Sequence, residues 1–335
     1  MKNICIITQH PFWAEPLGCG TLLRARYELL QSQFDNVFVL FITRGSQSCP
    51  LVGATLRVQG NILQEHINGI QNYLIKNQIS ICYFSYDNHG VLPQFTNCLN
   101  IVEIHDVLHL RAEQFKKYGY KPPIEKTKVD ELESLRQYDI VFSINTNEVS
   151  YLRKNDVPNT YYFPPNRRFS ELNKTNKPGN YGLIASRASP NVDGFNCLPG
   201  PIKSSENFVI AGPLSKDPTA LSQINTNALA MGIVSKPLYF YQTIDLAISP
   251  LRFGGGLKIK VFEALSYGVP ILATKHSIDG FPGKIDDVVT IEDDIEAWNL
   301  DLLNDSKLTK SSVIKDYFLH HCHEHRCAEI IQKLV

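Results

Sequence analysis

The sequence predicts an α/β protein with two doubly wound parallel sheets, each in its own domain. Short apolar runs, typical of fully buried parallel strands, alternate with longer helical patterns. A polar, proline-containing stretch interrupts this alternation at residues 163–180, and the alternation restarts beyond it. At 335 residues the chain also exceeds the roughly 250 to 300 residues at which a single hydrophobic core stops growing.

The first domain is expected over residues 1–165. Its apolar runs predict parallel strands, and the longer segments between them carry helical spacing of apolar residues. A glycine-containing loop joins the first strand to the first helix. The expected strands are 4–8, 37–42, 81–84, 101–104 and 140–144, and the expected helices are 22–30, 62–77 and 126–137.

The second domain is expected over residues 175–311. Because ligands of open parallel sheets bind at the carboxyl ends of the strands, functional residues of both domains are expected there. The expected strands of this domain are 181–186, 207–212, 245–250 and 271–274, and a final helix is expected over 312–335.

The composition is that of an ordinary globular enzyme and excludes several other classes. Hydrophobic residues make up 43% and charged residues 20%, which excludes a mainly disordered chain. Lysine plus arginine and aspartate plus glutamate both number 33, so no overall field attracts nucleic acid or an anionic membrane. We find no signal-peptide core, no stretch apolar enough to span a membrane, and no Cys-x-x-Cys pair among the eight cysteines. We therefore expect a cytosolic protein with reduced thiols.

Residues 252–282 carry the most informative pattern of the chain. Three consecutive glycines, Gly254 to Gly256, leave backbone N–H groups accessible to an anion. They precede a helix whose N-terminal dipole favours the same negative charge. Lys258 and Lys260 lie in the first turn of this mostly apolar helix. A lysine at that end of a helix opposes the dipole unless an anion is bound. The pattern therefore predicts a phosphate site.

This pattern resembles the donor-binding half of retaining glycosyltransferases of the GT-B type, in the large group often called family four. In that family the glycine loop and a lysine or arginine contact the diphosphate of a nucleotide sugar, which implies this role for Lys258 and makes Lys260 and Arg252 further candidates. The family's glutamate before Ala-Leu binds the ribose hydroxyls, and Glu263 occupies that position. One departure is Gly255, where the family often has a second glutamate that contacts the donor sugar.

Two further loops of the second domain match the family more loosely. Arg187 follows the first strand of this domain, where the family has another basic phosphate ligand. Gly212 ends the next strand and is similar to the family's turn beside the base, although a glycine there is often only a turn. The resemblance implies the GT-B architecture, two Rossmann-like domains that face each other across a cleft, with the final helix crossing back to the first domain.

In the first domain, His105 and Asp106 directly follow an apolar strand. A lone histidine is usually structural, but the strand end and the adjacent carboxylate favour a functional site here. The family has a histidine at this place that contacts the donor sugar near the reacting carbon. Gly18 and Gly20 resemble the family's first glycine loop, where acceptor and donor approach the helix that follows. They lack the third glycine and the acidic residue of a dinucleotide-binding fingerprint.

The segment from His320 to Cys327 raises the alternative of a metal site. His321 and His325, like His323 and Cys327, are four residues apart and would share a face of the expected final helix. No second cluster supplies the remaining ligands, and we find no Asp-x-Asp flanked by apolar strand residues. We therefore expect no metal and no other cofactor.

The resemblance implies a glycosyltransferase of the hexosyltransferase type that moves a sugar from a nucleotide diphosphate to an acceptor hydroxyl with retention. Its place would be glycan or polysaccharide biosynthesis, and its acceptor a glycan, a lipid-linked sugar or a protein, with peripheral membrane contact through a lipid-linked acceptor. No carboxylate is an obvious nucleophile, so a front-face substitution guided by His105 fits better than a double displacement. Two alternatives stay open: a nucleotide-sugar epimerase of the same fold, and a non-catalytic subunit that binds sugar nucleotides, which Gly255 favours.

Overall fold

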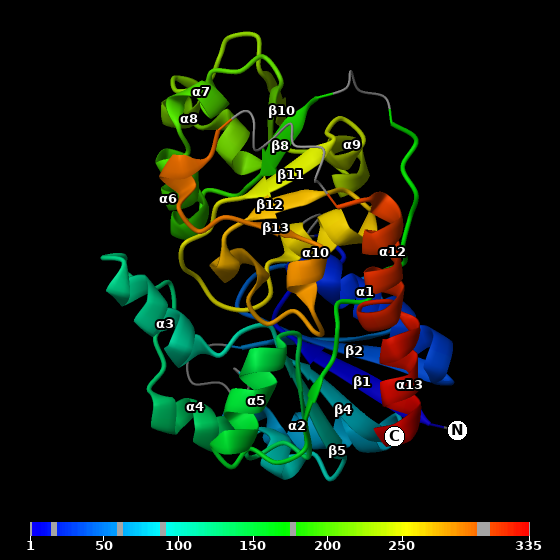
Figure 1. The fold of residues 1–335 in the computed structure, drawn as a ribbon. Helices are drawn as coiled ribbons and strands as arrows, with labels where there is room; N and C mark the ends of the chain where they lie inside the picture. The colour runs from blue at the N-terminus through cyan, green and yellow to red at the C-terminus, as the bar shows by residue number, and fades with distance from the viewer. Residues whose placement is uncertain are drawn as a thin grey trace. The chain divides into compact units, whose positions relative to one another are not determined.

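The structure is a computed structural model that describes residues 2–14, 19–58, 63–87, 92–174, 179–299 and 309–334. The chain divides into two compact units, each with one parallel sheet (Figure 1). Unit 1 comprises Met1–Ala112, Pro123–Asn166 and Glu324–Val335, and unit 2 comprises Glu113–Pro122 and Arg167–His323.

Unit 1 contains a seven-stranded sheet in the order β3-β2-β1-β4-β5-β6-β7, and every neighbouring pair is parallel. The strand order reverses between β1 and β4, so the loops that follow these two strands lie at the topological switch point. The strands are β1 (Asn3–Thr8), β2 (Asn36–Thr43), β3 (Gly53–Arg57), β4 (Ile79–Ser85), β5 (Leu99–Ile104), β6 (Ile140–Ser143) and β7 (Thr160–Tyr162).

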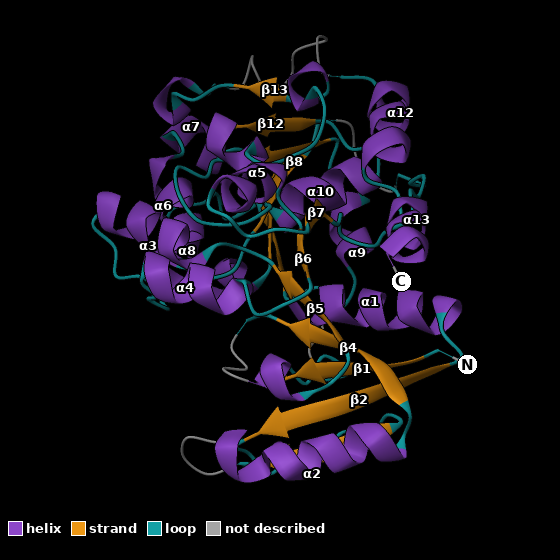
Figure 2. Ribbon diagram, turned by 90° about the horizontal axis from the view of Figure 1, so that it is seen from below, coloured by secondary structure: helices purple, strands orange, loops and turns teal. Residues whose placement is uncertain are grey.

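Two apolar layers cover this sheet. One contains α1 and α13 and includes Leu30 and Ile331, and the other contains α2, α4 and α5 and includes Leu74 and Leu135. Figure 2 shows α1 and α2 on opposite sides of β1 and β2. The helices are α1 (Cys19–Gln33), α2 (Leu63–Lys76), α4 (Lys128–Leu135), α5 (Thr146–Lys154) and α13 (His325–Leu334), with a 3-10 turn η1 (Leu92–Phe95); α3 (Leu108–Lys117) begins in unit 1 and ends in unit 2.

Unit 2 contains a six-stranded parallel sheet in the order β10-β9-β8-β11-β12-β13. Its strand order reverses between β8 and β11, which places a second switch point at the ends of these strands. The strands are β8 (Tyr181–Ile184), β9 (Phe208–Ala211), β10 (Leu229–Gly232), β11 (Leu246–Ser249), β12 (Ile271–Ala273) and β13 (Thr290–Ile291).

Helices also pack on the unit 2 sheet. Phe195 of α6 and Ile202 of α7 share an apolar cluster with β8, β9, β11 and β12. Gly182 of β8 is close to Phe240 and Ile244, and a Cβ added there would lie 2.8 Å from the Ile244 side chain. The elements are α6 (Ser189–Cys197), α7 (Gly200–Lys203), α8 (Pro218–Leu221), α9 (Pro237–Tyr241), α10 (Ile259–Ser266) and α12 (Ser311–His321), with 3-10 turns η2 (Pro213–Lys216), η3 (Lys275–Ile278), η4 (Ile285–Asp287) and η5 (Ile295–Ala297).

The expected architecture of two doubly wound parallel sheets is confirmed, and one expected helix is wrong. The final segment forms two helices, α12 and α13, because the helix ends at Cys322, whose φ of −124° is not helical. This break lets the segment cover two separate apolar surfaces: α12 packs against α10 in unit 2, and α13 packs against α1 in unit 1. Among the helices in the described part of the chain, none combines the length and hydrophobicity that a membrane span requires.

Candidate functional site

The glycine loop predicted to bind phosphate lies at the switch point of the unit 2 sheet. It follows β11 and leads into α10, and the first turn of α6, which comes after the neighbouring strand β8, lies against it. Lys260 donates a hydrogen bond from Nζ to Oδ1 of Asn191, and a Cβ added to Gly254 would lie 3.6 Å from Pro190. The glycine loop and the N-terminal turns of α6 and α10 therefore meet where open parallel sheets bind their ligands.

The backbone of this loop requires glycine at two positions. Gly254 has a φ of 132° and Gly256 a φ of 62°, conformations that residues with a side chain rarely adopt. No side chain of these glycines covers the backbone between β11 and α10. The helix that follows directs its N-terminal amides toward the same end.

Lys258 is the N-cap residue of α10 and is only 7% exposed. Its Nζ donates hydrogen bonds to the carbonyl oxygens of Gly256 at 2.8 Å and Gly255 at 3.4 Å. The ammonium group therefore bends back over the glycine loop instead of extending into solvent. A buried ammonium held by neutral carbonyls gains a stronger, charge-assisted partner when an anion binds beside it.

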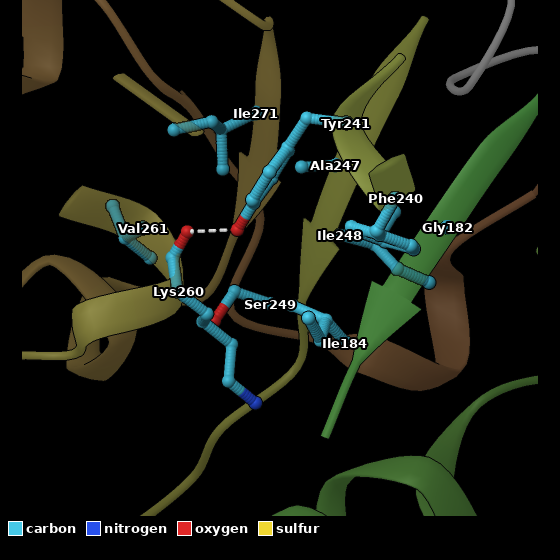
Figure 3. A pocket seen from close by; sticks show the side chains of 10 residues that line it. All are labelled: Gly182, Ile184, Phe240, Tyr241, Ala247, Ile248, Ser249, Lys260, Val261 and Ile271. Atoms are coloured by element: carbon cyan, nitrogen blue, oxygen red, sulfur yellow. Dashed lines mark hydrogen bonds between the residues drawn. The ribbon is translucent and has the colours of Figure 1, made fainter. Parts of the chain in front are cut away.

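Lys260 lies in the first turn of α10 and is partly exposed. Burial of its ammonium group lowers the pKa of Lys260 to about 7; the Glu263 carboxylate opposes this shift and the Lys258 charge adds to it. Its side chain borders a small, mostly apolar pocket that has room for about one water molecule. Figure 3 shows this pocket, and Tyr241 on its wall donates a hydrogen bond of 2.8 Å to the backbone oxygen of Lys260. The pocket is too small for a nucleotide, so we regard it as a packing gap beneath α10.

Glu263 is 9% exposed and is held by an arginine that the sequence reasoning missed. Arg167 lies 3.2 Å from its carboxylate and also donates a hydrogen bond to the hydroxyl of Tyr267. Burial raises the pKa of Glu263, and the Arg167 charge opposes that shift. The only sequence signal for Arg167 is its place in an arginine pair at the end of the proline-containing linker.

Arg252 has a close acidic partner within unit 2. Its guanidinium donates hydrogen bonds of 2.8 and 2.7 Å to the two carboxylate oxygens of Asp193 on α6. Tyr120 donates a third hydrogen bond to Asp193 at 3.1 Å, and the rings of Tyr118 and Tyr120 both stack on Phe253. These contacts fix the strand-side end of the glycine loop, and a direct phosphate contact from Arg252 stays a prediction.

His276 also borders the glycine loop and was not predicted. It lies in η3, after β12, and its Nε2 would be 3.9 Å from a Cβ added to Gly254. That nitrogen is buried and has no hydrogen-bond partner among the described residues. Burial and, to a smaller extent, the nearby Lys258 charge together lower the pKa of His276 to about 3. The imidazole beside the loop is therefore neutral at physiological pH.

Two other predicted donor residues have local structural roles. The Arg187 side chain is 52% exposed; its Nε lies 3.4 Å from an Asp217 carboxylate oxygen, and its Nη2 donates to the Lys216 carbonyl. Gly212 has a φ of 84°, and a Cβ added there would lie 2.5 Å from the Ala185 carbonyl oxygen. This close approach alone explains why position 212 is a glycine. Because local contacts account for both residues, ligand contacts from Arg187 and Gly212 stay predictions.

The candidate residues of unit 1 gather at the switch point of its own sheet. His105 follows β5, Tyr86 follows β4 and His10 follows β1. The Tyr86 hydroxyl oxygen lies 2.5 Å from Nδ1 of His105, and the ring of His10 packs against Tyr86 with centroids 5.3 Å apart. Burial lowers the pKa of His105, while the carboxylates of Glu103 and Asp106 oppose this shift. The net effect favours a neutral imidazole.

Asp106 forms an ion pair with Arg111 of α3, with 2.6 Å between Oδ2 and Nη1. Its other carboxylate oxygen is buried without a hydrogen-bond partner in the part of the chain that is described. His109 of the same helix is 4% exposed, and its ring nitrogens contact Glu131 at 2.6 Å and Tyr151 at 2.7 Å. His109 is therefore a structural residue, whereas Asp106 retains an acceptor for a ligand.

The first glycine loop is only partly described. Gly18 lies outside the described residues, and Gly20 is buried in the first turn of α1. The members of the His320 to Cys327 segment are divided between α12 and α13, so the helical spacing that suggested a metal site does not occur. Among the described residues, no group of three or more histidine, cysteine or acidic side chains is arranged to hold a metal ion.

Comparison with known proteins supports the resemblance seen in the sequence. A family model described as glycosyl transferases group 1 matches residues 195–302, which include the glycine loop and α10. No curated protein matches the chain significantly by sequence.

Solved structures of GT-B glycosyltransferases share the fold over nearly the whole chain. Sucrose-phosphate synthase from Thermosynechococcus elongatus matches with a TM-score of 0.73 and 13% identity, covering 100% of this chain and 98% of that one. HepE of Anabaena, in complex with UDP and glucose, matches with a TM-score of 0.69 and 10% identity over 100% of both chains. A glycosyltransferase from Rickettsia africae ESF-5 matches with a TM-score of 0.70 and 12% identity, covering 99% and 97%. The chain thus has the GT-B fold, and a segment of unit 2 matches the model of group 1 glycosyl transferases.

Proposed function

We propose that this protein is a retaining glycosyltransferase that transfers a hexose from a nucleotide diphosphate sugar to an acceptor hydroxyl. The observation that carries the proposal is the glycine loop with Lys258 at the switch point of the unit 2 sheet, inside the segment that matches group 1 glycosyltransferases. Because HepE is similar in fold and its structure contains UDP and glucose, we take a uridine diphosphate sugar as the first donor to test.

The proposed chemistry uses charges that the chain itself supplies. Departure of the leaving group builds negative charge on the diphosphate, and preorganised donors that face this charge lower the barrier. Lys258, Lys260 and the loop amides are the proposed donors of unit 2, and Glu263 is the proposed acceptor for the ribose hydroxyls. In unit 1, His105 is the proposed contact to the reacting sugar, with Asp106 beside it. A front-face substitution accounts for retention without a carboxylate nucleophile.

Incubation of the protein with a labelled UDP-sugar and a panel of glycan, lipid-linked and protein acceptors tests this function. A transferase releases UDP and labels one acceptor, in glycan or polysaccharide assembly. An epimerase gives an altered free nucleotide sugar, and a non-catalytic subunit binds the donor without converting it. Either of the last two outcomes would refute the proposed transfer.

We expect that Lys258→Ala and Glu263→Ala each weaken UDP binding by about tenfold to a hundredfold. Each variant loses a charged contact to the ligand, and such a hydrogen bond is worth about 1.5 to 3 kcal/mol. Isothermal titration calorimetry with UDP measures the change. Lys315→Ala is the matched control, because Lys315 pairs with Glu171 on the surface of the same unit. Unchanged affinity in both Lys258→Ala and Glu263→Ala would rule out this donor site.

We also expect transfer to continue without a divalent cation. The basic side chains and helix N-terminal amides of the glycine loop are proposed to replace the metal that neutralises the diphosphate in other glycosyltransferases. Activity measured in EDTA should therefore equal activity in buffer alone. Loss of most activity in EDTA, restored by Mg²⁺ or Mn²⁺, would contradict the assigned roles of Lys258 and Lys260.

A further inference from the structure

A tyrosine contacts the candidate catalytic histidine of unit 1, and nothing in the sequence pattern assigned it a role. Tyr86 directly follows β4, one of the two strands at the switch point, and its hydroxyl oxygen lies 2.5 Å from Nδ1 of His105. The two rings are packed edge to face with centroids 4.5 Å apart. The hydroxyl and the ring of Tyr86 therefore both contact the imidazole.

The backbone of Tyr86 is in a conformation that an aromatic residue rarely adopts. Its φ is 67°, in the left-handed region that glycine or asparagine occupies with less strain. The N–H of Tyr86 donates a 2.9 Å hydrogen bond to the carbonyl oxygen of Glu103, which holds the residue in this position. A glycine would adopt this backbone conformation with less strain, so the strained position carries a side chain that contacts His105. Strained residues of this kind concentrate at functional sites.

The charges around His105 decide which of its nitrogens carries the proton. The carboxylate of Glu103 lies 3.9 Å from Nε2, and it is fixed by Arg26, whose Nε is 3.0 Å from it, and by the hydroxyl of Tyr83. A carboxylate on that side of the ring favours a proton on Nε2. Nδ1 is then an acceptor, and it accepts a hydrogen bond from the Tyr86 hydroxyl.

We propose that Tyr86 is a positioning residue, whose hydroxyl donates to Nδ1 of His105 and holds the neutral imidazole in one orientation with its proton on Nε2. The role of His105 in catalysis rests on the proposed function, but the hydrogen bond and the tautomer do not. The groups that face His105 are Tyr86, Glu103, Asp106, Arg26 and His10. Of these, only Tyr86 is a neutral hydroxyl that can donate to Nδ1, so its removal leaves the charges of the site unchanged.

Tyr86→Phe tests the proposal, because it keeps the ring and removes one hydroxyl. Tyr151→Phe is the matched control, since Tyr151 makes the same kind of bond to His109 in the same unit, at 2.7 Å. Two measurements are made on each variant. The first is the ¹⁵N NMR spectrum of the histidine rings, recorded without nucleotide sugar, in which the His105 resonances are assigned by their absence from His105→Ala. The second is the kcat for sugar transfer and the KM for the nucleotide sugar.

In the wild-type protein we expect Nδ1 of His105 to be the unprotonated nitrogen, with its resonance displaced by a hydrogen bond. Tyr86→Phe should move that resonance toward the position of a free imidazole nitrogen and lower kcat about tenfold, the effect of one neutral hydrogen bond, with little change in KM. Tyr151→Phe should change neither. If the wild-type protein transfers no sugar, the proposed function fails, and the nitrogen resonances still decide whether Tyr86 sets the state of His105.

Three results would overturn the proposal. A protonated Nδ1 in the wild type would mean that Tyr86 accepts instead of donating. An unchanged kcat in Tyr86→Phe, despite a shifted Nδ1 resonance, would mean that the hydrogen bond does not serve the reaction. An equal loss of kcat in Tyr151→Phe would mean that any tyrosine–histidine bond of unit 1 acts through stability alone.

Discussion

Arg26→Met is expected to lower the free energy of unfolding by about 3 to 5 kcal/mol, the usual cost of removing one partner of a buried ion pair. Arg26 is 1% exposed and Glu103 is 2% exposed, and their closest contact is 3.0 Å. The same guanidinium donates to the carbonyl oxygens of Phe163 and Pro164 and contacts the sulfur of Cys327 on α13. Methionine fills much of the volume but removes the only charged donor that these contacts give the buried Glu103 carboxylate, and it removes the arginine hydrogen bonds to the two carbonyls.

The double variant Arg26→Met/Glu103→Gln separates the cost of unpaired charge from the cost of lost packing. A glutamine keeps the shape of Glu103 without its charge, so the double variant should be more stable than Arg26→Met alone. Arg136→Met is the control, because Arg136 is exposed and, among the described residues, donates to the carbonyls of Asn155 and Asp156 alone. Its effect should stay within about 0.5 kcal/mol. Chemical denaturation measures all three.

The loss of stability in Arg26→Met should also depend on pH. In the wild type, burial raises the pKa of Glu103, but Arg26 and its other partners hold it below the ordinary value, so its contribution is present at neutral pH and lost in acid. In Arg26→Met, Glu103 is still buried but has lost its cation, so its pKa should rise above that of a glutamate in the unfolded chain. The buried carboxylate then lowers the free energy of unfolding at neutral pH, and this effect disappears below pH about 4, where the group is protonated in both states. The difference in free energy of unfolding between Arg26→Met and the wild type should therefore become smaller in acid. A difference that stays constant or grows in acid would contradict a buried charge on Glu103.

The interior of both sheets could be predicted from the sequence, and the edges could not. β1, β4, β5 and β11 each contain a run of apolar residues rather than a strict alternation, because both of their faces are buried. β3 and β10 lie at sheet edges and are partly exposed, so their sequences lack this signal. The break at Cys322 was also missed, since both helices beside it have helical spacing and the cause lies in the surfaces that they cover.

The candidate site was predictable where one short segment carries it. The glycine loop, Lys258 and Glu263 lie within ten residues, and local spacing was enough to relate them to a helix N-terminus. Arg167, His276 and Tyr86 come from separate segments, and only the fold brings them to Glu263, to the glycine loop and to His105. Single polar residues at strand ends carry little signal of their own, because loops are polar whether or not they bind a ligand.

His105→Ala is expected to lower kcat about 100- to 1000-fold, the range seen when one preorganised donor to the transition state is removed. The nucleotide contacts are proposed to lie on Lys258 and Glu263 of unit 2, so the Kd for UDP should change little. An interaction that forms mainly in the transition state lowers kcat, whereas one that forms equally in the ground state changes binding. Because burial keeps the pKa of His105 below its ordinary value, the neutral form should persist to mildly acidic pH, and wild-type activity should fall only below that range.

Steady-state kinetics and calorimetry on the same preparations test this division of roles. His66→Ala, on α2 of the same unit, is the control for a general effect of removing an imidazole, and it should keep wild-type kcat. Lys258→Ala should show the reverse pattern to His105→Ala, with weaker UDP binding as its first effect. If His105→Ala kept wild-type kcat, or lost UDP affinity as severely as Lys258→Ala, His105 would be a structural histidine whose hydrogen bond to Tyr86 only stabilises the end of β5.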